Sequence, residues 1–342
     1  MHEFMLALDS AGDKDARTEM IANCREQYKG KSKILSNIDK FENQSMDDNR
    51  ENAIKWYTAN SFIHRCTNTV LRKENISQVY TYRYIIKLIC QQLKELHKEF
   101  IDEFKERQKT KLRVYRGQYL KMDQIELLKK NRGNLISMNG FVSTTKEQSI
   151  ALQFIRQCPQ NNFEPVLFKI DLDMTGKHNV PFAYIKDISE YKDEEEVLLS
   201  IGSVFSVKSV EFDEVDSGLE VYIIHLSLKR DNQFTVTEYI TQTYATNADS
   251  DDKAVLFGKL LFDMGESRAA IKYFSDALKR LTDHNNHLQP IYFNNIGVCY
   301  SEIKNKTEAL KYYQAALEIY EKTDNQRGIS ACRHNVSLVL LH

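Results

Sequence analysis

The seven residues DEEEVLL, at positions 193–199, place three carboxylates directly before an apolar segment. Successive side chains of a β-strand point to opposite faces, so a strand here would put Glu194 and Glu196 on one face and Glu195 on the other. Two carboxylates at the start of a strand can take separate roles, one stabilising a cation and the other removing a proton. The simpler interpretation is a solvated charge run, since charged side chains are usually exposed. Two upstream segments weigh against it.

The first upstream segment is KLRVYRG, at residues 111–117. Its alternating pattern and its β-branched and aromatic residues predict a strand. Arg116 would share a face with Val114 and Leu112, and a buried arginine needs an anionic partner because an unpaired buried cation is costly. Gly117 allows close approach to the backbone. The alternative is an arginine on an edge strand that faces water.

The second upstream segment is FVSTT, at residues 141–145. It predicts a strand that ends in the hydroxyls of Ser143, Thr144 and Thr145, with a helix following over 147–157. Hydroxyls at this place can bind a ligand. They can also simply cap the helix, since serine and threonine are preferred N-cap residues.

The remaining pattern predicts a helical block before a β-rich block, which is typical of an α+β protein. Hydrophobic residues with a 3.6-residue period predict two long helices within 49–108. Further elements are a helix over 122–130 and strands over 166–172, 180–185, 203–210 and 219–228.

Composition excludes several classes of protein. The chain has 342 residues, 42% hydrophobic and 28% charged, with a net charge of −1, so it carries no bulk charge that would attract nucleic acid or a membrane surface. The first residues lack the basic start and apolar run of a secretory signal. No apolar stretch approaches the roughly 18–20 residues of a membrane span. We expect a cytoplasmic protein without nucleic-acid or membrane partners.

Cysteine and histidine patterns give no sign of a metal site. The six cysteines are scattered and none forms a CxxC motif, so we interpret them as reduced thiols. The nine histidines show no ligand spacing. We therefore expect no bound metal.

Residues 250–342 contain an internal repeat. Five landmarks, Gly258, Ala270, Tyr273, Phe274 and Ala277, recur 39 residues later as Gly297, Ala309, Tyr312, Tyr313 and Ala316. Small residues let paired helices approach closely, and aromatic residues fill the space between them. The pattern resembles tetratricopeptide repeats, whose standard length is ~34 residues. The longer spacing indicates a longer turn or linker between the helices. Such repeats imply a groove for a peptide or protein partner.

The three motifs of the middle region, taken together and in order, resemble a known family. Tyr115-Arg116-Gly117, the strand from Phe141 to Thr145 and the Glu-x-Glu-Val-Leu segment from Glu194 are similar to the motifs of arginine-specific mono-ADP-ribosyltransferases of the arginine–serine–glutamate class. The resemblance covers roughly residues 50–230. It implies a helical lobe and a mixed, mostly antiparallel core of two sheets, with an all-α repeat segment after it. It also implies that the co-substrate is NAD+, bound without the glycine-rich GxGxxG fingerprint.

The resemblance also implies roles for individual residues. Glu196 would stabilise the ribosyl cation, Ser143 would orient Glu196, and Arg116 would hold the pyrophosphate. Glu194 would orient the acceptor arginine of a protein and take its proton. Further expected contacts with NAD+ are those of Gly117, Ser143, Thr144, Arg156 and Phe163, and Tyr191 would contact the acceptor together with Glu194.

These inferences divide the chain into four parts. We expect an N-terminal helical extension over 1–48, the transferase domain over 49–230, a linker over 231–249, and two and a half repeats over 250–342. Two other functions stay open at this point. The same residues would serve an NAD+ glycohydrolase, in which water is the acceptor, and a catalytically inactive domain would leave the chain a repeat scaffold.

Overall fold

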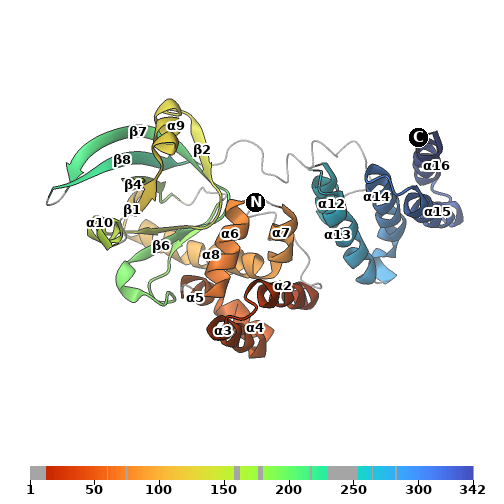
Figure 1. Ribbon diagram of the computed structural model, residues 1–342, viewed down its shortest axis with the longest axis horizontal. Helices are drawn as coiled ribbons and strands as arrows, with labels where there is room; N and C mark the ends of the chain where they lie inside the picture. Colours follow the sequence, from red (N-terminus) through yellow and green to blue (C-terminus); the bar gives the residue numbers. More distant parts are fainter. Residues whose placement is uncertain are drawn as a thin grey trace. The chain divides into compact units, whose positions relative to one another are not determined.

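The computed structural model describes residues 13–59, 61–73, 76–157, 162–175, 180–215, 218–229, 253–263, 265–281 and 283–341 (Figure 1). They form two compact units. One holds the described residues of 17–73 and 81–229, and the other holds those of 13–16, 76–80 and 253–341. The expected linker, 231–249, lies outside the described residues. Among the described helices, none has the length and apolar character that crossing a membrane requires.

The chain before the sheet is helical, as the pattern predicts, but its first half is divided into shorter helices. Of the two long helices expected within 49–108, the second is present as the 24-residue helix α8 (Arg83–Glu106), whereas the first is divided into short helices because the chain breaks repeatedly there. One break lies at Ser61, whose hydroxyl accepts a hydrogen bond from the backbone N–H of Ile63 (3.1 Å) and so caps a new helix. The helices are α2 (Asp13–Gln27), α3 (Ser32–Asn43), α4 (Met46–Glu51), α5 (Ala53–Thr58), α6 (Phe62–Arg72), α7 (Ile76–Thr81) and α8 (Arg83–Glu106).

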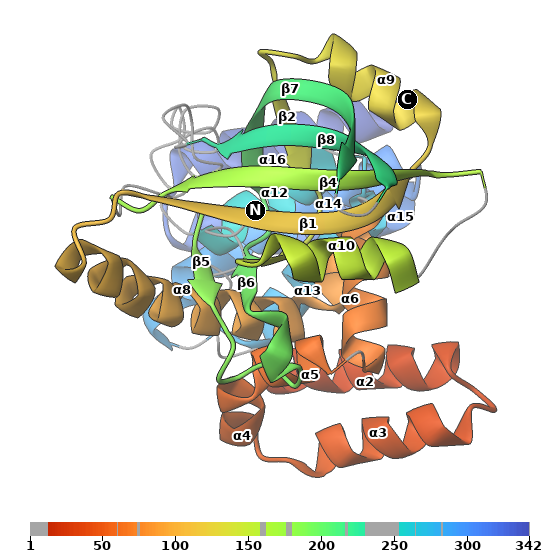
Figure 2. The same cartoon turned by 90° about the vertical axis from the view of Figure 1, so that its left-hand side faces the viewer.

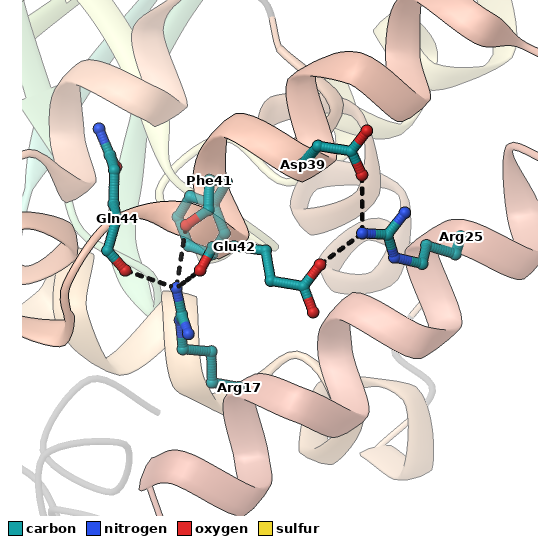
Figure 3. A network of polar contacts seen from close by, with 6 residues as sticks. All are labelled: Arg17, Arg25, Asp39, Phe41, Glu42 and Gln44. Carbon is teal, nitrogen blue, oxygen red and sulfur yellow. Dashed lines mark hydrogen bonds and ion pairs between the residues drawn. The ribbon is translucent and has the colours of Figure 1, made fainter.

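Two arginines of α2 hold the end of α3 (Figure 3). The Arg17 guanidinium donates to the backbone carbonyls of Phe41, Glu42 and Gln44, at 2.9, 2.8 and 2.9 Å. These carbonyls belong to the last turn of α3 and the residues after it, where intrahelical donors run out. Arg25 pairs with the carboxylates of Asp39 and Glu42. The helix pair is therefore joined by polar contacts.

One mixed sheet forms the centre of the first unit. Its strands are β1 (Lys111–Leu120), β2 (Leu135–Met138), β3 (Val142–Thr145), β4 (Glu164–Asp173), β5 (Phe182–Tyr184), β6 (Glu196–Leu199), β7 (Ser203–Val215) and β8 (Leu219–Leu228). The strand order is β2-β7-β8-β4-β1-β3-β6-β5, and only the β4–β8 pair is parallel. The mostly antiparallel sheet is thus confirmed.

The expected division of the core into two sheets is not confirmed. A single residue pair, Tyr115 opposite Thr145, joins β1 to β3 and so links two groups of strands into one eight-stranded sheet. The short strand β2, which the sequence pattern did not predict, pairs with β7 at one edge.

Helices cover both faces of the sheet (Figure 2). Along β4, Val166 and Phe168 pack in the larger core, with Phe100 of α8 and Ile125 of α9 (Met122–Lys130). Leu167 points to the opposite face, as strand alternation requires, and packs with three residues of α10 (Gln148–Gln157), namely Ala151, Leu152 and Ile155. In Figure 2, α10 runs along β1 and α9 lies beside β7.

The second unit is built from helix pairs. Its elements from residue 253 onward are α12 (Lys253–Asp263), α13 (Ser267–Lys279), the 3₁₀ turn η3 (Asp283–Leu288), α14 (Gln289–Glu302), α15 (Lys306–Lys322) and α16 (Gln326–Leu341). A Cβ added to Gly258 would come within 2.1 Å of the Phe274 ring, and one added to Gly297 within 2.6 Å of the Tyr313 ring. The residues that recur in the sequence therefore make the same glycine–aromatic contact in each helix pair.

Candidate active site

Sheet register brings the three motifs of the middle region together. Strands β1, β3 and β6 are neighbours; Tyr115 pairs with Thr145, which pairs on its other side with Glu196. Beside this row lies a cavity of about 330 Å³. The cavity is lined by Tyr57, Thr58, His64, Tyr115, Arg116, Gly117, Ser143, Thr144, Thr145, Ala151, Phe154, Tyr191, Glu194 and Glu196.

Arg116 is held in place by its own sheet. Its Nη1 donates to the backbone carbonyl of Ser143 (2.7 Å), and its Nε donates to Oε1 of Gln118 (3.1 Å). Burial lowers the pKa of the guanidinium below its ordinary value. These two bonds use two of the five N–H donors of an arginine. A cation that is partly removed from water at a cavity wall, with donors to spare, suits a phosphate group.

Glu196 lines the cavity with only 4% of its surface exposed. The Ser189 hydroxyl donates to its Oε2 (3.2 Å), and the side chain of Ser143 also hydrogen-bonds the carboxylate. Burial raises the pKa of Glu196, while the two serines and Arg116 oppose that rise. Sequence reasoning missed Ser189, because its role depends on the turn that folds it back onto β6.

The two carboxylates of the motif do not belong to one strand, and this corrects the expectation of simple strand alternation. Glu194 ends the 3₁₀ turn η2 (Lys192–Glu194), and Glu195 has a left-handed backbone, φ 47° and ψ 44°. Strand β6 begins only at Glu196. Glu194 and Glu196 nevertheless line the same cavity, and Glu194 is partly exposed where Glu196 is buried. Burial, and then the nearby charge of Glu196, raise the pKa of Glu194.

The helical lobe supplies one wall of the cavity, which sequence reasoning did not foresee. Tyr57 of α5 donates a hydrogen bond to Oδ1 of Asn68 (3.0 Å), and its ring packs against His64 of α6, with ring centroids 5.1 Å apart. Burial raises the pKa of Tyr57 to about 12, and burial together with nearby arginines lowers the pKa of His64. Both side chains are therefore uncharged at neutral pH.

The lobe also anchors the turn that carries Glu194. The Thr58 hydroxyl accepts a hydrogen bond from the backbone N–H of Glu190 (3.2 Å). The backbone N–H of Tyr191 donates to the Ser189 hydroxyl (3.2 Å), and Tyr191 itself is 45% exposed beside the cavity. An exposed aromatic ring next to Glu194 is suited to contact a large partner.

Three cavity residues also have structural duties. The Thr144 hydroxyl donates to the backbone carbonyl of Val197 (2.6 Å), and the Thr145 hydroxyl accepts from the N–H of Glu147 (3.1 Å) just before α10. A Cβ on Gly117 would lie 2.0 Å from the carbonyl oxygen of Ala151. Gly117 is thus needed first for the close packing of α10 on β1.

Two expected NAD+ contacts do not line the cavity. Arg156 lies in the last turn of α10, not on a loop, and Phe163 lies just before β4, with its ring 6.0 Å from Nζ of Lys121. Phe154, which is 44% exposed, lines the cavity instead. Its helical position, one turn beyond Ala151, is the sequence signal that would have found it. Among the described residues, no group of three or more His, Cys, Asp or Glu side chains could hold a metal.

Several solved structures are similar to this chain. HopU1, an ADP-ribosyltransferase of Pseudomonas syringae pv. Tomato DC3000, is 18% identical with a TM-score of 0.42, over 65% of this chain and 98% of that one. The ADP-ribosyltransferase Vis of Vibrio splendidus, in complex with agmatine, is 18% identical with a TM-score of 0.40, over 60% and 89%. Plx2a, an ADP-ribosyltransferase toxin from Paenibacillus larvae, is 17% identical with a TM-score of 0.38, over 61% and 96%.

One curated protein, response regulator aspartate phosphatase I of Bacillus subtilis (strain 168), is 25% identical over 163 residues. The match covers 44% of this chain and 41% of that protein, so the chain spans less than half of its relative's length.

Family models match both parts of the chain. The tetratricopeptide repeat model matches residues 252–322, in agreement with the helix pairs and their recurring glycine–aromatic contacts. The model of the ADP-ribosyltransferase exoenzymes matches residues 27–230, which is more than half of the chain and contains every residue of the cavity. The chain therefore belongs to the ADP-ribosyltransferase exoenzyme family.

Proposed function

We propose that this protein transfers ADP-ribose from NAD+ to an arginine of a protein acceptor. The observation that carries the proposal is the pair of carboxylates, Glu194 and Glu196, on one cavity with Arg116. The two carboxylates lie in different surroundings, because Glu196 is buried and Glu194 is partly exposed, at a place that we refer to as the rim of the cavity. Two carboxylates in different surroundings can take different roles in one reaction.

NAD+ fits the residues around the cavity. The Arg116 fork offers N–H donors to the oxygens of the diphosphate, and Glu196 offers a buried anion to the nicotinamide ribose. A volume of about 330 Å³ is at the small end for a ligand site. We therefore expect the cavity to take the nicotinamide–ribose end of the dinucleotide and to leave the adenosine end near its mouth.

The first chemical step is cleavage of the bond between the ribose C1′ and the nicotinamide nitrogen. The bonding electron pair leaves with nicotinamide, which becomes neutral, and the ribose becomes an oxocarbenium cation, as in glycoside cleavage. Glu196 stabilises this cation from a site that Ser143 and Ser189 hold fixed. In our proposal Ser143 and Ser189 orient the carboxylate, and Arg116 holds the phosphates.

The second step needs an acceptor at the rim, where Glu194 is placed. A guanidinium is a poor nucleophile because it is always protonated, and it attacks C1′ only as it gives up a proton. The Glu194 carboxylate pairs with the guanidinium and takes that proton. Its raised pKa makes it a better base than an ordinary glutamate. Tyr191 and Phe154, both exposed at the cavity, would contact the acceptor protein.

The test uses the full chain with NAD+ and agmatine, a small guanidinium acceptor. We expect mass spectrometry to find ADP-ribosyl-agmatine, and a separate assay to find an equal amount of nicotinamide. Glu194→Gln should lose the agmatine product but still release nicotinamide slowly, with water as the acceptor. Asp193→Asn, one residue away and exposed outside the cavity, is the matched control and should keep both.

Two results would contradict the proposal. Free ADP-ribose as the sole product of the parent chain would indicate a glycohydrolase. No nicotinamide release from the parent chain would indicate an inactive domain.

The repeats lead to a second proposal, which concerns partners. The helix pairs α12–α13 and α14–α15 pack through small and aromatic residues, and repeats of this kind bind peptides or proteins. We propose that they bind a protein partner. Co-purification of the partner with the full chain, and its loss from residues 1–230 alone, would test this.

A further inference from the structure

We propose that Glu195, which does not line the cavity, is a positioning residue that sets the place of Glu194 at the rim. This inference rests on the proposed function, because it concerns the base of the transfer step.

The backbone of Glu195 is the first observation. Its φ of 47° lies in the left-handed region, which residues other than glycine adopt only at a cost. This single residue turns the chain from the 3₁₀ turn that ends at Glu194 into strand β6. Side chains two apart in a continuous strand would share one face and similar burial. The turn at Glu195 is what lets Glu194 stay partly exposed while Glu196 is buried.

The side chain of Glu195 is the second observation, because three groups hold it. The Lys186 ammonium and the Tyr184 hydroxyl both bond to its carboxylate, and Nζ of Lys146 lies 3.2 Å from Oε2. Lys146 also sits 3.3 Å from the centroid of the Tyr184 ring. These partners lie at or just beyond the ends of β3 and β5, the two strands that flank β6. We refer to Lys146, Tyr184 and Lys186 as the Glu195 clamp.

The backbone is held at the same place. The N–H of Lys146 donates to the carbonyl of Glu195 (3.1 Å), and the N–H of Ile185 donates to the carbonyl of Glu196 (3.0 Å). The clamp lowers the pKa of Glu195 to about 2, with Lys186 the largest cause. Glu195 is therefore ionised, and its bonds to the clamp persist, wherever Glu194 and Glu196 are ionised.

Glu194 itself lacks such support. Within the described part of the chain, no hydrogen bond or ion pair holds its carboxylate. Its position consequently depends on the backbone that leads to it, and on one side that backbone is fixed by Glu195. A side chain outside the cavity thus determines where the base of the reaction lies.

The test compares two activities in Glu195 variants. Releasing the clamp should displace Glu194 and leave Glu196 in its strand. We expect Glu195→Ala to lower kcat for transfer to agmatine by up to about 10²-fold, as for a small misplacement of a reacting group. Nicotinamide release without an acceptor should stay close to that of the parent. Glu195→Gly separates the effect of the clamp from that of the backbone strain, because glycine accepts a left-handed backbone and has no side chain for the clamp to hold. This variant should also lose transfer.

Substitution of the clamp itself provides the second arm. Lys146→Met should reproduce the selective loss, and adding it to Glu195→Ala should cost little more, since the two act through one contact. Lys192→Met, an exposed lysine outside the clamp, is the control and should change neither activity. Equal rates for parent and Glu195→Ala, or an equal loss of both activities, would overturn the inference. A parent chain without nicotinamide release would instead contradict the proposed function.

Discussion

The repeats and the active-site cavity place their important residues in opposite ways. In the repeats, each contact is local: Gly258 meets Phe274, and the same spacing brings Gly297 to Tyr313. In the cavity, Tyr57, Arg116 and Glu196 come from distant parts of the chain, and sheet register brings the last two together. A recurring sequence pattern is therefore enough to identify the local contacts of the repeats, whereas the contacts of the cavity can be identified only from the fold.

The largest effect should come from the buried carboxylate of the cavity. Glu196→Gln should lower nicotinamide release by about 10²–10³-fold, since the uncharged amide cannot stabilise the cation. The same change should raise thermal stability. Burial raises the folded-state pKa of Glu196, so the folded protein loses stability as pH rises from the unfolded pKa through the folded one, and glutamine removes this loss. A kinetic assay of nicotinamide release and a thermal melt at pH 7 check these two effects. A variant that is less stable than the parent and equally active would contradict the role of Glu196.

A glycine of the sheet tests a long-range contact. In Gly117→Ala the new Cβ would lie 2.0 Å from the backbone oxygen of Ala151, which cannot move without shifting α10. We expect a loss of about 3 kcal/mol in the free energy of unfolding, the upper part of the range for overpacking. Denaturant unfolding of the first unit measures it. A change below about 0.5 kcal/mol would mean that α10 does not pack this closely.

A glycine of the repeats tests a local contact in the same way. In Gly297→Ala the new Cβ would meet the ring of Tyr313 at 2.6 Å, but a ring can shift and alanine favours a helix by roughly 0.5–1 kcal/mol. We therefore expect a smaller loss, about 1 kcal/mol, confined to the unfolding of the repeats. Gly258→Ala should behave alike because it meets Phe274. Nicotinamide release should be unchanged in both variants, and a fall in release would break the comparison.

The smallest effect should be a change in pH dependence. Burial and the charge of Glu196 raise the pKa of Glu194, so Glu194 takes up a proton at a higher pH than an ordinary glutamate. A protonated Glu194 cannot accept the guanidinium proton. The ratio of transfer to hydrolysis should therefore fall as pH is lowered through this raised pKa. A ratio that is constant with pH in the parent would contradict the role of Glu194.

Much of the first unit could be predicted from the sequence. Alternating, β-branched and aromatic residues predicted β1, and the segments 141–145 and 219–228 were predicted as the strands β3 and β8. The resemblance of three ordered motifs to a known family predicted that Arg116, Ser143, Glu194 and Glu196 meet, and all four line one cavity. The helix over 122–130 was predicted with the bounds of α9. The strands and the helix follow from local pattern, which one chain displays on its own, whereas the grouping of the four site residues follows from the resemblance.

Other features could not be predicted because they depend on distant contacts. The wall formed by Tyr57 and His64 arises from packing of the helical lobe, and Ser189 reaches Glu196 only through a turn. The left-handed residue Glu195 carries no local signal, since glutamate rarely adopts that backbone. Arg156 and Phe163 were expected to contact NAD+ because the resemblance implies a loop there. Helix α10 instead extends to Gln157, and it is Phe154 of this helix that lines the cavity.

The central claim is that three neighbouring strands form one NAD+ site, and calorimetry tests it most directly. NAD+ titrated into the slow Glu196→Gln chain should bind at one site, and binding should be lost when Arg116 is also changed to Gln. Adding Arg113→Gln instead should leave binding intact, because Arg113 lies on the same strand but is exposed and pairs with Asp171 at 2.6 Å. Equal binding by the Arg116 and Arg113 variants, or no binding by Glu196→Gln alone, would contradict the account.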